Sequence, residues 1–144
     1  MKKKIDGSQL NKQLCFPLYV ASKETVRKYR PFLEELDLTY TQYITLLALW
    51  GNDNQNVKDL GNTLFLDSGT LTPVLKSLEN KGFVKRNRLP SDERNLVVSL
   101  TEKGLHLKRS ASSIPEKVAK QINISDEEYD QLYTILYKII ESQN

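Results

Sequence analysis

The chain has 144 residues, a formal net charge of +3 and 39% hydrophobic residues. This length fits one domain that can bury its own core. No apolar run approaches the roughly 20 residues that a membrane-spanning helix needs. Polar residues follow the lysines at the amino end, so a secretory signal is not expected. We therefore expect a single domain, residues 1–144, located in the cytoplasm and without a membrane partner.

The sequence contains one cysteine, Cys15, and one histidine, His106. A lone cysteine forms no internal disulfide, and no Cys/His cluster has the spacing of metal ligands. The sequence also contains no glycine-rich phosphate loop and no nucleophile accompanied by a base and an acid. The expectation is a protein that is not an enzyme and uses no metal or cofactor.

Apolar residues recur at helical spacing from about residue 13 to residue 33, which predicts a long amphipathic helix. Pro17 would break a helix interior but is tolerated in a first turn. We therefore expect the helix to start near residue 13 or 14. This start places Cys15 close to a helix N-terminus.

Residues 39–81 predict three helices. Thr39 and Gln42 have the spacing of a capping box, and the apolar run after them ends at Gly51. Asn56 is expected to cap a short helix, and a turn at 65–67 leads into another helix at 68–81. Two short helices joined by a tight turn predict a helix-turn-helix. The residues expected to face inward from the second of these helices are Leu71, Val74, Leu75 and Leu78.

The hydrophobic period changes from 3.6 to 2 after residue 82. This change predicts strands at 83–88 and 96–100, joined by a charged turn at 89–95. Seven basic residues lie between residues 84 and 109, against three acidic ones. A helix-turn-helix followed directly by a basic hairpin predicts a winged helix.

A further helix is expected from residue 101 to about 122, with a bend at Pro115. A capping box at 125–128 begins a last helix with an apolar stripe. These terminal helices need a partner, and a second copy of the chain is the simplest one. The predicted fold is mainly α with a small β-hairpin: a winged helix at about 39–100, flanked by dimerisation helices at about 10–34 and 101–144. The expected stripe consists of Leu132, Ile135, Leu136, Ile139 and Ile140.

The outward face of helix 68–81 is small, polar and weakly basic, which suits a helix lying in a DNA major groove. Arginines on the wing suit a narrow minor groove, and lysines suit phosphates. A solvated helix face is the alternative for this helix taken alone, but the basic wing that follows favours binding to double-stranded DNA. The predicted DNA-binding residues are Ser68, Thr70, Thr72, Lys76, Lys85, Arg86, Arg88 and Arg94.

Several strings resemble the MarR family of winged-helix regulators. They are DSGTLTPVLKSLE at 67–79 and the wing pattern Asp92-x-Arg94 ahead of LTEKG at 100–104. The strings LCFPLY at 14–19 and LTYTQY at 38–43 narrow the resemblance to the OhrR group of organic-hydroperoxide-sensing repressors. The resemblance runs from about residue 10 to residue 103. It implies a homodimeric repressor that binds operator DNA and places Arg94 in the minor groove.

The same resemblance implies that Cys15 senses organic hydroperoxides, with the hydroxyls of Tyr29 and Tyr40 of the partner subunit on its sulfur. A peroxide is attacked by the thiolate, and a helix N-terminus and hydrogen bonds favour that anion. A second, resolving cysteine is absent. Oxidised Cys15 should therefore form a mixed disulfide with a small cellular thiol or become overoxidised. The expected peroxide pocket consists of Phe16, Leu18 and Tyr19.

Other interpretations remain open. Cys15 can be a small buried hydrophobe, and Tyr29 and Tyr40 can be ordinary interface aromatics. Within regulation, the chain can be a broader redox or virulence regulator, or a MarR-type regulator that responds to a small aromatic ligand. Outside it, the alternatives are a single-cysteine peroxidase and a winged-helix protein-interaction module.

Overall fold

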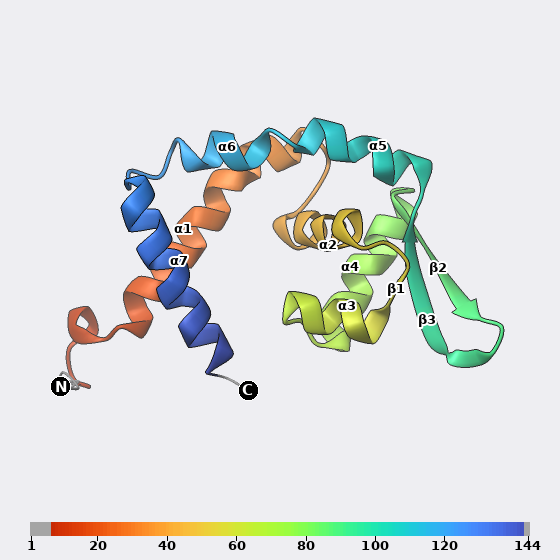
Figure 1. The fold of residues 1–144 in the computed structure, drawn as a ribbon, viewed down its shortest axis with the longest axis horizontal. Helices are drawn as coiled ribbons and strands as arrows, with labels where there is room; N and C mark the ends of the chain where they lie inside the picture. The colour runs from red at the N-terminus through yellow and green to blue at the C-terminus, as the bar shows by residue number, and fades with distance from the viewer. Residues whose placement is uncertain (1–6, 143–144) are drawn as a thin grey trace.

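The computed structural model describes residues 7–142, except for the side chains of Glu93 and Arg94. A winged helix formed by α2, α3, α4 and a small sheet lies at one end of the molecule, and α1, α6 and α7 lie at the other (Figure 1). Helix α5 runs from the sheet toward α6. The helices are η1 (Leu10–Lys12), α1 (Cys15–Glu34), α2 (Tyr40–Gly51), α3 (Val57–Leu64), α4 (Ser68–Asn80), α5 (Glu102–Ala111), α6 (Ile114–Ala119) and α7 (Asp126–Glu141).

Helix α1 begins at Cys15 and has Pro17 in its first turn, so the expected helix start is confirmed. A short 3₁₀ helix, η1, precedes it. Leu33, near its other end, is buried, and α1 packs there against α2 and α6. The packed end of α1 is therefore the end opposite Cys15.

The helix-turn-helix is confirmed. Thr39 and Gln42 form the expected capping box at the start of α2. Asn56 caps α3 by accepting a hydrogen bond from the backbone N–H of Asp59 at 2.7 Å. Helix α3 ends at Phe65 in the left-handed conformation, with φ 53°. The turn also brings the Leu66 carbonyl so close to Gly61 that a Cβ there would lie 2.7 Å from it.

The sheet is antiparallel, with the order β1-β3-β2. Its strands are β1 (Gln55–Asn56), β2 (Val84–Leu89) and β3 (Asp92–Leu100). The hairpin was expected. Strand β1 was not, because a segment of two residues is too short to show an alternation of apolar and polar residues. The prediction of a turn at 89–95 is wrong. Strand pairing continues to Leu89 opposite Asp92, and only residues 90 and 91 form the turn. An irregularity in register after Arg88 takes up the additional residues of β3.

The helix expected from residue 101 to about 122, with a bend at Pro115, is instead interrupted before that proline. The chain forms α5 and α6, separated at residues 112 and 113. Pro115 lies in the first turn of α6. It has no N–H to donate to the carbonyl four residues earlier, at Ala111, and its ring crowds that carbonyl. Helix α5 therefore ends at Ala111, before the proline rather than at it.

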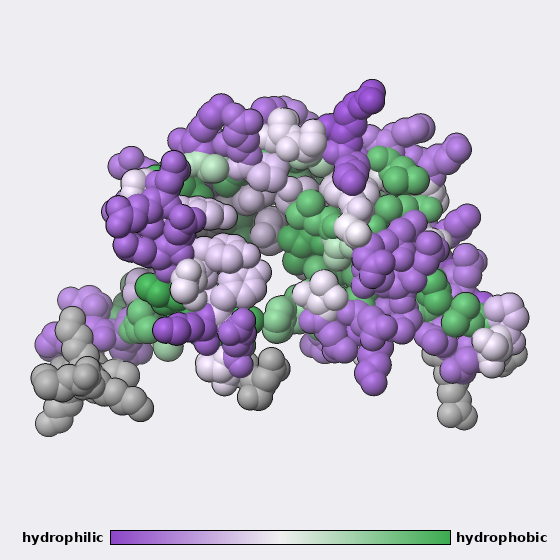
Figure 2. Space-filling view, in the orientation of Figure 1, coloured by the Kyte–Doolittle hydropathy of each residue, from purple (hydrophilic) through white to green (hydrophobic). Residues whose placement is uncertain are grey.

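The core lies between α2, α3, α4 and the sheet, and the same buried cluster continues between α1 and α6. Helix α7 has no buried residue, although its capping box at Ser125 is formed as expected. The hydropathy-coloured surface also shows hydrophobic side chains uncovered over α2 (Figure 2). None of the helices within residues 7–142 has the length and apolar character needed to cross a membrane. The principal core residues are Leu46, Leu49, Leu60, Leu71, Leu75, Leu78 and Val98.

Candidate DNA-binding surface and redox site

Helix α4 presents a small polar face beside its buried stripe. Its N-cap, Asp67, accepts a hydrogen bond from the backbone N–H of Thr70 at 2.8 Å, which fixes the first turn. Pro73 lies within the helix and donates no backbone bond. Of the α4 residues expected to face DNA, Ser68, Thr70 and Lys76 are exposed and Thr72 is half-buried.

A hydrogen-bonded cluster behind this face was not foreseen. Gln42, only 5% exposed, donates from Nε2 to the Ser77 hydroxyl at 2.8 Å. The Gln42 side-chain oxygen accepts from the backbone N–H of Thr39 and from the Lys81 ammonium, both at 3.1 Å. The cluster joins α2 to α4. The Ser77 hydroxyl is therefore engaged by α2.

The wing places its basic residues in different surroundings. Lys85 and Arg88 are exposed. Arg86 is not: its side chain is 18% exposed, and its Nη2 lies 3.1 Å from Glu79 Oε1. The Glu79 carboxylate of α4 therefore holds the Arg86 guanidinium, and the contact of Arg86 with DNA stays a prediction. The side chain of Arg94 lies outside the described residues.

Cys15 is exposed and is the first residue of α1. The N-cap, Leu14, supplies no side-chain hydrogen bond to the first turn. The N–H groups of a helix start carry partial positive charge and favour an anion nearby. Apolar residues adjoin the cysteine along the chain: Phe16 and Tyr19 are exposed, and Leu18 is half-buried. The three residues expected to form a peroxide pocket therefore flank Cys15 without enclosing it.

Tyr29 and Tyr40 meet where α1 lies against the start of α2. Their ring centroids are 5.1 Å apart in an edge-to-face arrangement, and Tyr43 completes the group at 5.8 Å from Tyr29. Burial raises the pKa of Tyr29, with smaller contributions from Tyr40 and Tyr129, and burial raises the pKa of Tyr40. Both phenols therefore keep their protons at neutral pH and can donate hydrogen bonds.

The cysteine and the tyrosines do not meet within one chain. Cys15 and Tyr29 lie on the same helix, 14 residues apart. At 1.5 Å per residue, this separation is about 21 Å along the helix axis. The helix is continuous, so its own Tyr29 cannot approach the sulfur. Within one chain, Cys15 therefore stays far from Tyr29 and from Tyr40, which packs on Tyr29.

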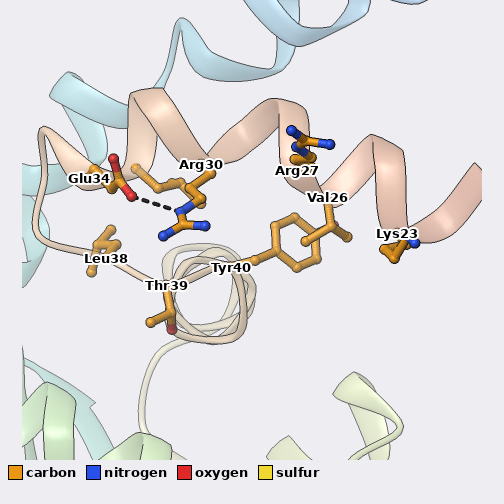
Figure 3. Close-up of a pocket in the computed structure, with 9 residues that line it drawn as sticks. Lys23, Val26, Arg27, Arg30, Glu34, Leu38, Thr39 and Tyr40 are labelled. Carbon is orange, nitrogen blue, oxygen red and sulfur yellow. Dashed lines mark hydrogen bonds and ion pairs between the residues drawn. The ribbon is translucent and has the colours of Figure 1, made fainter.

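An open pocket of about 530 Å³ lies between α1 and the start of α2. Tyr40 points from α2 toward Val26 of α1, and the Arg30–Glu34 ion pair, at 2.8 Å, lies at the other end of the lining (Figure 3). The lining is mainly apolar with basic residues among it. Within residues 7–142, no group of three Cys, His, Asp or Glu side chains is placed to hold a metal ion. The pocket residues are Lys23, Val26, Arg27, Arg30, Leu33, Glu34, Leu38, Thr39 and Tyr40.

A helix-turn-helix joined to a three-stranded wing, with small polar residues on the second helix, defines a winged-helix transcription regulator. The family described as transcriptional regulator SarA/Rot matches residues 27–110. The HTH-type transcriptional regulator SarZ of Staphylococcus aureus is 48% identical over 136 residues, which cover 94% of this chain and 92% of SarZ. The chain belongs to the SarA/Rot family of transcriptional regulators.

Two solved structures agree with this assignment. Reduced AbfR bound to DNA superposes with a TM-score of 0.80 and 34% identity, covering 99% of this chain and 96% of the other. Disulfide-formed AbfR superposes with a TM-score of 0.63 and 34% identity, covering 93% and 89%. AbfR is a protein of Staphylococcus epidermidis. These structures share the winged-helix fold described above.

Proposed function

We propose that this regulator is a homodimeric repressor that binds operator DNA when Cys15 is reduced and releases it after an organic hydroperoxide oxidises Cys15. The observation that carries the proposal is the separation of Cys15 from Tyr29 and Tyr40 within one chain. A second copy is needed to complete the redox site, so a change at the sulfur acts directly on the contact between subunits.

The DNA-binding part of the proposal rests on α4 and the wing. Ser68, Thr70 and Thr72 face the major groove, Lys76 and Lys85 contact phosphates, and Arg88 lies toward the minor groove. Arg94 at the wing tip enters the minor groove. Arg86 is left out of this set because Glu79 engages it. The DNA-bound form of AbfR supports this arrangement by its likeness.

Dimerisation is supported by the terminal helices, 10–34 and 101–142. Helix α7 buries no side chain within the protomer, yet it carries a wide apolar stripe. Leu132 and Ile135 are 46% and 54% exposed. Single exposed apolar residues are common, but a continuous stripe along a 16-residue helix marks an interaction surface. A second copy of the chain covers it in the proposed dimer.

In the proposed chemistry, the Cys15 thiolate attacks one oxygen of the hydroperoxide and the O–O bond breaks. The sulfur is oxidised by two electrons to sulfenic acid, and the peroxide leaves as an alkoxide that takes a proton from water. The sulfenic acid then condenses with a small cellular thiol, which forms a mixed disulfide and releases water. The hydroxyls of Tyr29 and Tyr40 of the partner subunit stabilise the thiolate before the reaction.

Release from DNA follows from the added bulk. A capped Cys15 displaces the partner's tyrosines and changes the distance between the two α4 helices. A dimer reads half-sites about one helical turn apart, so it is sensitive to this distance. A hundredfold loss of affinity requires only about 2.7 kcal/mol. The lost hydrogen bonds and one new steric contact supply an amount of this order.

The test measures binding of reduced protein to duplex DNA from upstream of its own gene. The measurement is repeated after stoichiometric organic hydroperoxide and a small thiol, with Cys15→Ser as the matched variant. The proposal expects wild type to lose its affinity and Cys15→Ser to keep it. Unchanged binding by oxidised wild type would contradict it, and sustained peroxide turnover with excess thiol would indicate a peroxidase.

The pocket beside Tyr40 favours a second candidate, a regulator that responds to a small aromatic ligand. Its apolar lining and the cations Lys23 and Arg27 suit an aromatic carboxylate. Addition of such compounds to the DNA-bound, reduced protein tests this alternative. Release of Cys15→Ser from DNA by an aromatic carboxylate would favour it over peroxide sensing.

A further inference from the structure

The junction between the recognition helix α4 and the wing contains an ion pair between Glu79 and Arg86. Glu79 is the next-to-last residue of α4, and Arg86 lies in β2. Glu79 Oε1 accepts from Arg86 Nη2 at 3.1 Å, and Glu79 Oε2 accepts from the backbone N–H of Arg86 at 2.9 Å. One carboxylate therefore holds both the side chain and the main chain of the wing strand.

Arg86 is less exposed to solvent than Lys85 and Arg88, which are also basic residues of the wing. Its side chain is 18% exposed, and its Nε is buried without a hydrogen-bond partner among the described residues. The exposed residues on either side, Lys85 and Asn87, contrast with it. A guanidinium turned toward α4 and partly removed from solvent has little capacity left for a DNA phosphate.

Other contacts also hold the wing: β1 pairs with β3 at Val97 and Val98, and two hydrogen bonds anchor the base of the wing. The Thr101 hydroxyl donates to the Gly82 carbonyl at 2.6 Å, and the Lys103 ammonium donates to the Lys81 carbonyl at 2.7 Å. Both contacts lie at the loop between α4 and β2. Arg86 lies further along the strand, opposite Val98 of β3. The pair with Glu79 is a direct polar contact between β2 and α4 beyond this loop.

We propose that Glu79 and Arg86 are positioning residues that set the orientation of the wing relative to α4, so that one duplex is contacted in its major and minor grooves together. Neither residue touches DNA in this arrangement. The inference rests on the proposed DNA binding and adds residues that determine its strength and specificity. It replaces the direct DNA contact that the basic character of Arg86 had suggested.

The first test uses Glu79→Gln in the full-length, reduced protein. Affinity is measured by fluorescence anisotropy with duplex DNA from upstream of the gene and with a random duplex of equal length. Removal of an acid near DNA strengthens binding if the acid only repels phosphates. The positioning role predicts the opposite: binding to the upstream duplex weakens about tenfold, and binding to the random duplex changes less. Stronger binding by Glu79→Gln would overturn the inference.

The second test compares Arg86→Ala with Lys85→Ala across a range of salt concentrations. A lost phosphate contact reduces the slope of log affinity against log salt concentration by about 0.9. We expect this reduction for Lys85→Ala. Arg86→Ala should lower the affinity about tenfold while the slope stays at the wild-type value. A reduced slope for Arg86→Ala would show that it contacts phosphate and would overturn the inference.

Two further variants protect the interpretation. Arg86→Lys keeps the positive charge but not the planar fork, and should bind between wild type and Arg86→Ala. It carries the test if Arg86→Ala does not fold, as judged by circular dichroism. The double variant of Glu79→Gln and Arg86→Ala should be no weaker than either single variant. If wild type binds no duplex, the proposed function itself fails. If wild type binds tightly but the losses of affinity in the two single variants add up in the double variant, only the positioning role is rejected.

Discussion

Gln42 donates a hydrogen bond to Ser77 across 35 positions of sequence, and this 2.8 Å contact joins the first turn of α2 to the recognition helix. The same amide completes the capping box with Thr39 and accepts a hydrogen bond from the Lys81 ammonium. Its donor and acceptor groups are thus engaged in a site that is almost fully buried. Buried polar groups that are fully paired specify one arrangement of the elements that they join.

Replacement of Gln42 by leucine should therefore lower the free energy of unfolding by about 1–3 kcal/mol, because buried donors lose their acceptor. Urea denaturation measures the change. Gln121→Leu is the matched control, since Gln121 is exposed after α6. Equal stability of the two variants would show that the buried amide contributes nothing.

Removal of the Tyr40 hydroxyl tests the redox site. Tyr40→Phe should slow peroxide oxidation of Cys15 about tenfold, which corresponds to one lost hydrogen bond to the thiolate. DNA binding by the reduced protein should weaken far less than it does on oxidation, because Tyr40→Phe adds no bulk at Cys15. Mass spectrometry of the reaction over time gives the rate. Tyr43→Phe, from the same ring cluster, is the control and should react as wild type does; equal rates for all three proteins would rule out a role for Tyr40.

Stability should fall in alkaline solution. Burial, followed by the neighbouring Tyr29 and Tyr40, raises the pKa of Tyr43 to about 12. An unfolded tyrosine ionises near pH 10, so above that pH the unfolded state loses its proton first. The contribution is complete below about pH 10 and is lost as pH rises toward 12, by up to about 1.4 kcal/mol per pH unit. Denaturation at several pH values should show a smaller slope for Tyr43→Phe, and identical slopes would contradict the prediction.

A charge on the apolar stripe of α7 should disrupt the proposed dimer. Ile135→Glu should raise its dissociation constant about a hundredfold, because a carboxylate buried in an apolar interface is poorly solvated. Sedimentation velocity measures the association. Thr134→Glu is the matched control, since the polar face of α7 carries it, about 100° around the helix from Ile135. A dimer unaffected by Ile135→Glu would place the interface elsewhere.

Gly104 should be intolerant of substitution. A Cβ there would collide with the Phe83 carbonyl, which is backbone and cannot turn away. Gly104→Ala should cost about 1–3 kcal/mol in the free energy of unfolding. Gly51→Ala adds the same methyl group where no atom beyond its own helix backbone and chain neighbours lies within 4 Å, and it should cost nothing. Thermal unfolding distinguishes them, and equal midpoints would refute the predicted collision.

The parts of the fold that depend on neighbouring residues could be predicted from the sequence. The capping box at Thr39, the cap at Asn56 and the start of α1 are local features, and each was placed correctly. The strand β1 could not be predicted, because its two residues form a strand only through pairing with β3. The end of α5 was misplaced because Pro115 acts on a carbonyl four residues before it.

The site residues divide in the same way. The sequence identifies Arg86 as basic and places it on a strand, but its direction depends on how α4 packs against β2. Glu79 carried no signal, since an acid near a helix end is ordinarily solvated. The two residues are brought together only by the tertiary structure. Cys15 was placed at a helix start correctly because that position depends on Pro17 and the apolar period.

The wing continues directly into α5, with Thr101 as the cap of that helix. Strand β3 has nine residues, so it extends about 30 Å. A rotation of about 5° at its base therefore moves its tip by about 3 Å. A small movement at the start of α5 is thus amplified at the tip of the wing. A regulator built in this way needs no large rearrangement to lose its operator. Changes too small to alter the gross shape of the molecule are multiplied by the length of the strand.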